Sequence, residues 1–365
     1  MTFSIAEHEY MSRAIQLAYR GLYTTDPNPR VGCVLVKNGE VIGEGWHERA
    51  GEPHAEINAL LQAGENAQGA TAYVTLEPCC VQGKTPPCSD ALIAAQLERV
   101  VIAMQDPNPK VAGNGIQQLR EAGMQVEAGL LEAQARALNP GFIQRMQTRR
   151  PYVRNKLAMS LDGRTAMADG ESKWITSEAA REDVQRWRAR SSAIVTGVGT
   201  ILADDPAMTV RLPGMDRQPL RVIIDTNLST PPTAKILKQP GRTLIMTSSD
   251  DEAVLTQLQE AGAEIVQLPQ QGERIDLSAL LEELADMEIN EILLETGATL
   301  SGAMLEAGLI DELIIYMAPL LMGDAARPLF KLPHLATMQD RIDLELCEVR
   351  SVGKDLRVIA TPIYK

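Results

Sequence analysis

The sequence predicts an α/β protein made of two consecutive domains. Short apolar runs typical of strands alternate with segments of helical periodicity, which favours mostly parallel sheets covered by helices. The chain has 365 residues, more than one compact domain usually holds, and 45% of them are hydrophobic, enough for two cores. Asn139-Pro140-Gly141 interrupts the alternation. We place the boundary near Thr148, which gives domains of residues 1–148 and 149–365.

The first domain is predicted to begin with a helix and a hairpin. Ser4 to Glu7 has the spacing of a capping box, and apolar residues recur at helical intervals from Met11 to Ala18 before Gly21 ends the helix. Residues 31–36 form a strand, and Asn38-Gly39 signals a type I′ turn into a return strand. The further elements expected here are a helix from about Ala55, a strand at 71–76, a helix from Ser89, a strand at 100–103 and a helix ending near Gly123.

The basic run Arg145 to Arg154 is interpreted as a solvated linker rather than a binding patch. A new strand pattern begins at Tyr152, and the same alternation then predicts a second α/β domain. Its expected strands lie at 193–195, 220–224, 243–246, 291–295 and 312–317, and its expected helices at 178–190, 252–261 and 277–284.

Composition narrows the possible partners. The chain has 35 Lys and Arg against 48 Asp and Glu, a formal net charge of −13, which would repel nucleic acid. Aromatic residues make up only 4%, too few for a base-stacking platform. No signal pattern and no run of about 20 apolar residues occurs, so we expect a cytoplasmic protein that does not enter membranes. The odd number of cysteines, five, favours free thiols or metal ligands over disulfides.

His54, Cys79 and Cys88 form the most informative chemical pattern. One imidazole and two thiolates suit tetrahedral zinc with a water in the fourth position. Glu56, two residues after His54, can move a proton to and from that water. Cys79 and Cys88 lie nine positions apart, unlike the usual C-x-x-C, and three buried thiols with a core histidine are the alternative. Cys80 could compete as a ligand, but Cys79 directly follows Pro78, as the motif requires.

The segments 28–33, 45–56 and 76–88 resemble the deaminase half of the bifunctional riboflavin-biosynthesis deaminase/reductases, in which a long step between the cysteines is characteristic. The resemblance implies a cytidine-deaminase-like three-layer domain with one Zn²⁺ per chain. It implies deamination of 2,5-diamino-6-ribosylamino-4(3H)-pyrimidinone 5′-phosphate, with substrate contacts at Asn28, His47 and Lys84. A cation at Lys84 suits the ribose phosphate.

Residues 151 to about 322 resemble the reductase half of the same family. The motifs are Lys156–Gly163, Gly170–Thr176, Leu202–Arg211, Val222–Thr226 and Leu294–Gly297. The resemblance implies a dihydrofolate-reductase-like domain that uses NADPH to reduce the ribosyl group of 5-amino-6-(5-phosphoribosylamino)uracil to ribityl. NADPH is expected over NADH from the resemblance, because no single residue indicates it.

The residues themselves indicate where a dinucleotide binds. The segment from Gly297 follows a strand and opens a helix, whose backbone N–H groups can hold a pyrophosphate. Gly197-Val198-Gly199 lacks the third glycine of a Rossmann fingerprint, because Leu202 stands there.

The cofactor contacts implied by the resemblance are Ala158, Trp174, Thr200, Asp204, Thr226, Gly297, Ala298, Thr299, Leu300, Ser301, Gly302 and Ala303. The implied reductase substrate contacts are Lys156, Ser172, Arg188, Met208, Arg211 and Glu295.

Some roles stay open. An arginine fork at Arg188 or Arg211 suits a substrate phosphate. Lys156 fits either a group beside the reacting ribosyl carbon or a structural ion pair. The resemblance implies a homo-oligomer formed through the second domain. Apolar residues that suit either an interface or the core are Ile314, Ile315, Leu320 and Leu321.

Two other functions fit parts of the sequence. One is a nucleoside or tRNA deaminase with an inert second domain, which the acidic charge and the long loop around Lys84 oppose. The other is a zinc-stabilised binding or assembly protein with decayed sites, which the intact His54, Glu56, Cys79 and Cys88 oppose. We therefore expect an enzyme that acts on small phosphorylated pyrimidines.

Overall fold

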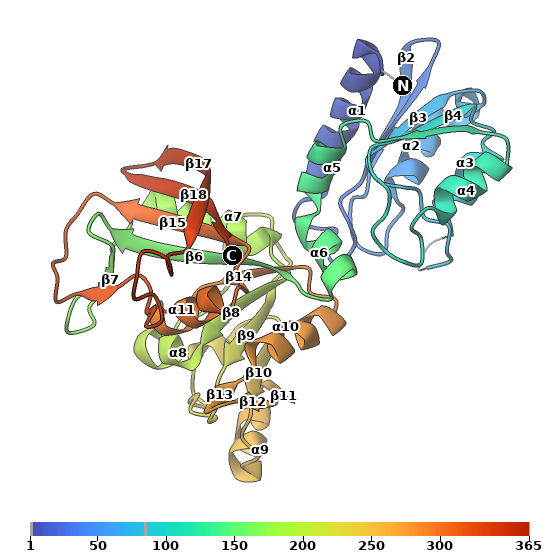
Figure 1. Ribbon diagram of the computed structural model, residues 1–365. Coiled ribbons are helices and arrows are strands. Elements are labelled where there is room, and N and C mark those ends of the chain that lie inside the picture. Colours follow the sequence, from blue (N-terminus) through green and yellow to red (C-terminus); the bar gives the residue numbers. More distant parts are fainter. Residues whose placement is uncertain (1–2, 84–85, 365) are drawn as a thin grey trace. The chain divides into compact units, whose positions relative to one another are not determined.

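The computed structural model describes residues 3–83 and 86–364 of the chain. The chain forms two compact units, one ending at Arg150 and the other beginning at Pro151 (Figure 1). Each unit has a hydrophobic core of its own. None of the helices within these described ranges is long and apolar enough to cross a membrane.

The first unit contains a five-stranded sheet of order β2-β1-β3-β4-β5. Two of its four strand pairs, both made by β1, are antiparallel, so this sheet is mixed rather than mostly parallel as expected. The strands are β1 (Gly32–Lys37), β2 (Glu40–Trp46), β3 (Thr71–Val74), β4 (Arg99–Ile102) and β5 (Gln125–Ala128). The helices are α1 (Ile5–Ala18), α2 (Ala55–Ala63), α3 (Cys88–Ala94), α4 (Asn114–Glu121), α5 (Glu132–Leu138) and α6 (Pro140–Thr148), with short 3₁₀ turns at Tyr19–Gly21 and Gly64–Ala67.

Glycines let helices pack directly on both faces of this sheet. A Cβ atom at Gly32 would lie 1.9 Å from the Ala14 carbonyl oxygen of α1. On the other face, a Cβ atom at Gly45 would lie 2.2 Å from the Ala55 carbonyl oxygen of α2. The predicted three-layer arrangement is confirmed, and this close packing fixes where α2 begins.

The second unit contains a nine-stranded sheet of order β11-β10-β9-β8-β14-β6-β15-β18-β17. It is parallel from β11 to β15, and β18 and β17 continue it antiparallel. The strands are β6 (Tyr152–Ser160), β7 (Arg164–Ala166), β8 (Ala193–Gly197), β9 (Leu220–Ile224), β10 (Thr243–Thr247), β11 (Glu264–Gln267), β12 (Gln270–Gln271), β13 (Arg274–Ile275), β14 (Glu291–Leu294), β15 (Glu312–Ala318), β16 (Arg327–Pro328), β17 (Asp343–Val352) and β18 (Asp355–Ile363). The helices are α7 (Glu178–Arg190), α8 (Val198–Asp204), α9 (Glu252–Glu260), α10 (Leu277–Asp286) and α11 (Ala298–Glu306), with a 3₁₀ turn at Lys235–Lys238.

Most predicted elements are confirmed. The Ser4 hydroxyl and the Glu7 carboxylate form the capping box of α1. Asn38 and Gly39 both have positive φ, as a type I′ turn requires. The predicted helix at 178–190 and strand at 220–224 match α7 and β9 at both ends. The elements that were not predicted are α5, α6, α8, β5, β7, β11, β12, β13, β16 and the hairpin of β17 and β18.

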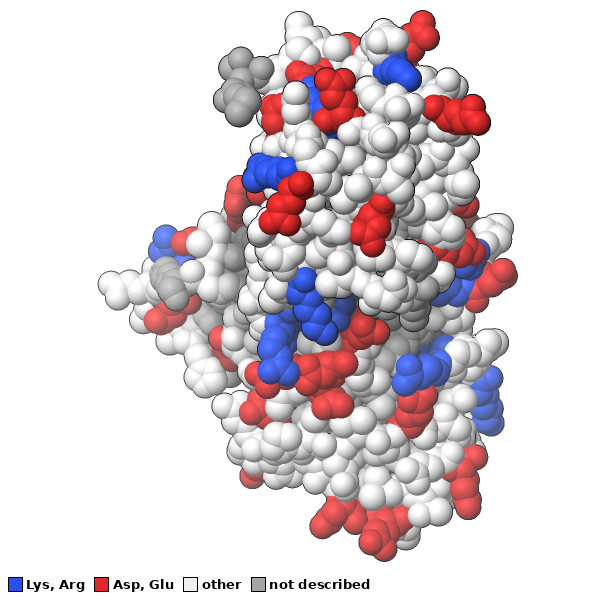
Figure 2. Space-filling view, turned by 90° about the vertical axis from the view of Figure 1, so that its right-hand side faces the viewer, with Lys and Arg blue, Asp and Glu red and all other residues white. Residues whose placement is uncertain are grey.

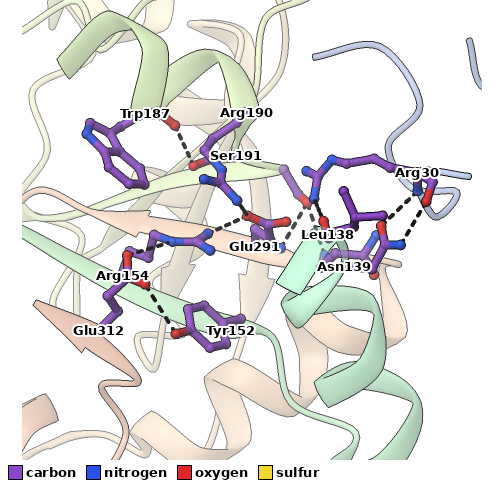
Figure 3. A network of polar contacts seen from close by, with 12 residues as sticks. Arg30, Leu138, Asn139, Tyr152, Arg154, Trp187, Arg190, Ser191, Glu291 and Glu312 are labelled. Carbon is purple, nitrogen blue, oxygen red and sulfur yellow. Dashed lines mark hydrogen bonds and ion pairs between the residues drawn. The ribbon is translucent and has the colours of Figure 1, made fainter. Parts of the chain in front are cut away.

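The interpretation of Arg145 to Arg154 as a solvated linker is wrong. Residues up to Thr148 belong to α6, and Arg154 lies on the central strand β6, where it is 2% exposed. Its guanidinium pairs with Glu291 and, at 3.0 Å, with Glu312 (Figure 3). These two carboxylates offset the cost of burying the charge, so Arg154 belongs to the core.

Four apolar residues were predicted to lie either in an oligomer interface or in the core, and their exposed fractions assign two of them to the core. Ile314 and Ile315 lie on β15 and are 0% and 8% exposed, so they belong to the core. Leu321 is 72% exposed.

Candidate functional sites

The first site brings together the three predicted metal ligands. His54 is the N-cap of α2, Cys88 is the first residue of α3, and Cys79 follows β3. Their ligand atoms all lie within 4.8 Å of one another. His54 Nδ1 lies 3.2 Å from Cys88 Sγ and 3.6 Å from Cys79 Sγ. One nitrogen and two sulfur donors at this separation are the donor set of a catalytic zinc site with an open fourth position.

The loop that carries Cys79 is held from both sides. The Glu77 carboxylate is 2% exposed and accepts hydrogen bonds from the backbone N–H groups of Asp106 at 3.1 Å, Gly113 at 3.0 Å and Ile116 at 3.1 Å. Beyond the ligand, the Ser89 hydroxyl donates to the Cys79 carbonyl oxygen at 3.1 Å. The position of Cys79 is therefore set by the loop after β4 as well as by α3.

Glu56 lies in the first turn of α2 beside this donor set and is 3% exposed. Burial, and then the negative charge of Cys79, raise the pKa of Glu56 to about 7. A carboxyl group with a pKa near neutrality can both accept a proton and return it.

Two of the three predicted substrate contacts of this domain lie together beside the metal ligands. Asn28 Nδ2 lies 3.1 Å from His47 Nε2, and His47 Nδ1 lies 3.2 Å from the Pro53 carbonyl oxygen. The rings of His47 and His54 meet edge to face at 5.1 Å. Burial lowers the pKa of His47, which favours the neutral ring. Because a carbonyl oxygen can only accept, the contact with Pro53 favours the tautomer with its proton on Nδ1. Lys84, the third predicted contact, lies outside the described residues.

The second site is a pocket of about 640 Å³ in the second unit, at the carboxyl ends of β8, β9 and β14. Gly297, the N-cap of α11, opens into it, so the first N–H groups of that helix face the space. These N–H groups can donate hydrogen bonds to the oxygens of a pyrophosphate. The predicted cofactor residues that line the pocket are Thr200, Asp204, Thr226, Gly297, Ala298, Thr299, Leu300 and Ala303.

The other predicted cofactor residues do not line this pocket. Trp174 is 69% exposed, and its ring lies under the Arg181 guanidinium at 4.6 Å. Ser301 is buried, and Gly302 packs so closely that a Cβ atom there would lie 2.0 Å from the Lys331 carbonyl oxygen. Ala158 lies on β6 opposite Tyr316 of β15.

The predicted substrate residues of the reductase form a charged cluster beside the pocket. Arg188 donates to both carboxylate oxygens of Glu295, at 2.6 and 3.0 Å, so its fork is engaged by Glu295. Burial alone would raise the pKa of Glu295, but the charges of Arg188, Lys156 and Arg211 outweigh it and hold the pKa below its ordinary value. Ser172 lines the pocket, whereas Met208 is buried, with a positive φ.

Lys156 has no carboxylate within ion-pair distance in the described part of the chain. Burial lowers the pKa of its amine, and the charge of Glu295 opposes that shift. Lys156 therefore lies within the electrostatic influence of the Glu295 carboxylate without forming an ion pair with it.

Three cations in the pocket wall were missed by sequence reasoning. They are Arg274 on β13, Arg327 on β16 and Lys331 after β16. Both strands are two residues long and carry no motif, so nothing in the sequence marked them.

Comparisons with known proteins agree with this arrangement. The cytidine and deoxycytidylate deaminase zinc-binding region matches residues 5–104, and the RibD C-terminal domain matches residues 151–358. The chain is 51% identical to the riboflavin biosynthesis protein RibD of Escherichia coli K12, over 95% of this chain and 97% of the relative. The corresponding protein of Haemophilus influenzae is 47% identical, over 99% of both chains.

Solved structures are similar over the whole chain. Acinetobacter baumannii RibD has a TM-score of 0.92 and 48% identity, over 98% of this chain and 99% of that one. A diaminohydroxyphosphoribosylaminopyrimidine deaminase/5-amino-6-(5-phosphoribosylamino)uracil reductase from Thermotoga maritima has a TM-score of 0.86 and 33% identity, over the same shares.

Proposed function

The chain belongs to the RibD family of bifunctional riboflavin-biosynthesis deaminase/reductases, and from that premise we propose which of its residues carry the two reactions. Its substrates are those named for the Thermotoga relative, a phosphoribosylaminopyrimidine for the deaminase and its deaminated aminouracil product for the reductase. The observation that supports this proposal is the pair of sites, a His-Cys-Cys donor set in one unit and, in the other, a pocket of about 640 Å³ into which the N-terminus of α11 opens.

In the deaminase, His54, Cys79 and Cys88 hold one zinc ion per chain. Zinc in such a site supplies a water of lowered pKa. Glu56 accepts a proton on its carboxylate and returns it to the amino group that leaves as ammonia, while the ring carbon gains oxygen. Neutral His47 and the Asn28 amide orient the pyrimidine beside Glu56.

In the reductase, the N-terminus of α11 would hold the pyrophosphate of NADPH, and Thr226 and Thr200 line the same pocket. NADPH supplies the hydride for the ribosyl carbon. Lys156 would donate a proton from Nζ to the oxygen or nitrogen whose bond to that carbon breaks as the hydride is added, and Glu295 fixes the Arg188 fork at the edge of the substrate site. Arg211, whose backbone N–H is bound by Gln185, is the cation available for the substrate phosphate.

The proposal is tested by following ammonia release and nicotinamide absorbance with the full-length, zinc-loaded protein. We expect ammonia from the diaminopyrimidinone phosphate, then NADPH oxidation. A chelator should stop ammonia release, while NADPH oxidation continues when the aminouracil phosphate is supplied directly. No NADPH oxidation with that substrate would contradict the reductase assignment, and deamination of tRNA or a free nucleoside would favour the alternative.

A small-molecule substrate agrees with the surface charge. Figure 2 shows acidic side chains beside the basic ones on the face in view, and the whole chain carries a net charge of −13. Nucleic acid is therefore disfavoured as a partner. We place the enzyme in the cytoplasm.

We also propose that the chain forms a homo-oligomer through the hairpin of β17 and β18. Strand β17 is the sheet edge, and Leu344, Leu346 and Val349 on it are 43%, 65% and 56% exposed. A long edge strand with exposed apolar residues tends to pair with another chain. Light scattering should show an oligomer that Leu346→Glu converts to monomer, whereas Leu161→Glu, at another exposed leucine, leaves it intact. A monomeric wild-type protein would contradict this.

A further inference from the structure

The dinucleotide pocket has two chemically different ends. In the sheet order β9-β8-β14-β6, the substrate cluster of Lys156 and Glu295 lies on the β6 and β14 side. Thr226 follows β9 and lines the pocket on the opposite side of β8. Because hydride transfer requires the nicotinamide beside the substrate, and α11 between the two ends would take the pyrophosphate, the adenosine of a bound dinucleotide would extend to the β9 end.

Arg274 is the cation at that end, because the β12–β13 ribbon that carries it is joined to Thr226 through Ser248. The Ser248 hydroxyl donates to the Thr226 carbonyl oxygen at 3.3 Å and accepts from Gln270 of β12 at 2.8 Å. It lines the pocket together with Thr226 and Leu277. Its neighbours fix its backbone: Ile275 is 3% exposed in the core, and the Asp276 carboxylate caps α10 by accepting from the backbone N–H of Ser278 at 2.8 Å. Among residues 3–83 and 86–364, no carboxylate pairs with the Arg274 guanidinium, so its fork is available to a ligand.

The other two cations of the pocket lie elsewhere. Lys331 donates its backbone N–H to the Ala298 carbonyl oxygen, at the first turn of α11, which is the pyrophosphate position. Arg327 lies on the β7–β16 ribbon, with its guanidinium against Gly170.

We propose that Arg274 binds the 2′-phosphate of the cofactor and thereby selects NADPH over NADH. The inference rests on the proposed reductase function. A guanidinium matches a phosphate dianion with two parallel hydrogen bonds, whereas the ribose hydroxyl of NADH offers neither the charge nor the geometry.

The test measures dissociation constants of NADPH, NADH and adenosine 2′,5′-bisphosphate by calorimetry with the full-length protein. Arg274→Gln should weaken NADPH and the bisphosphate by roughly 10- to 100-fold and leave NADH unchanged, because a charged hydrogen-bonded contact is lost. Arg274→Lys, which keeps the charge without the fork, should fall between. Lys238→Gln, at an exposed lysine on the 3₁₀ turn Lys235–Lys238 that does not line the pocket, is the matched control and should change nothing.

Other outcomes overturn the inference. Unchanged NADPH affinity in Arg274→Gln, or an equal loss for NADPH and NADH, would show that Arg274 does not contact the 2′-phosphate. Equal wild-type affinity for the two dinucleotides would show that no selection exists. A wild-type protein that binds neither would instead contradict the proposed reductase function itself.

Discussion

Replacing Glu56 by glutamine is expected to lower the rate of ammonia release by roughly 10²- to 10⁴-fold, the usual contribution of a general acid–base group. Glutamine has the same shape but cannot carry the proton from the nucleophile to the leaving amine. The side chain is buried and the ligand set does not include it, so the protein should retain its zinc. Ammonia release and elemental analysis on the same preparation measure the two effects.

Two further variants and the reductase activity serve as controls for the effect of Glu56→Gln. Glu52→Gln, an exposed carboxylate four residues earlier, should behave as wild type. His54→Ala should lose both zinc and deamination. NADPH oxidation with the aminouracil phosphate should persist in all three variants, because the reductase residues lie in the other unit. Full deaminase activity in Glu56→Gln would refute the assigned role.

The second large effect is expected from Glu77→Gln, although Glu77 is not a ligand. Its carboxylate accepts from three backbone N–H groups, and the amide of glutamine would turn a donor toward at least one of them. The free energy of unfolding should fall by about 2–4 kcal/mol. Because Glu77 lies two residues before Cys79, zinc affinity should fall by roughly 10- to 100-fold, as for other groups that orient metal ligands.

The measurement is zinc competition with a chelator at a temperature where the variant is folded, beside thermal unfolding. Glu65→Gln, an exposed carboxylate on the 3₁₀ turn after α2, is the control and should match wild type in both. Reduced stability with unchanged zinc affinity would show that Glu77 supports the fold without positioning Cys79.

The metal centre was largely predictable because its residue types are rare and each stands at the start or end of an element. The sequence placed His54 before a helix, Cys88 at a helix start and Cys79 after a strand, and the structure brings the three together. The role of Glu77 was not predictable. Its partners are backbone groups 29 to 39 positions further along, and backbone groups leave no pattern in a sequence.

The cofactor pocket was predictable only in part. The glycine at the start of α11 marked the pyrophosphate position by its context, a strand before and a helix after. Arg274, Arg327 and Lys331 come from short ribbons whose pairing depends on tertiary contacts. The burial of Arg154 was not predictable, because basic residues that are close together in a sequence usually face solvent. Its carboxylate partners, Glu291 and Glu312, lie more than a hundred positions further along the chain, so no local pattern indicates the ion pairs.

The ligand set of the first unit also connects distant segments of the chain. His54 and Cys88 are 34 positions apart, and Cys79 lies between them. One cation bound to all three acts as a cross-link, which closes two loops whose ends the unfolded chain would otherwise leave free to diffuse apart. Metal loading and folding of this half are therefore thermodynamically linked, so a cell short of zinc would lose folded deaminase as well as deaminase activity.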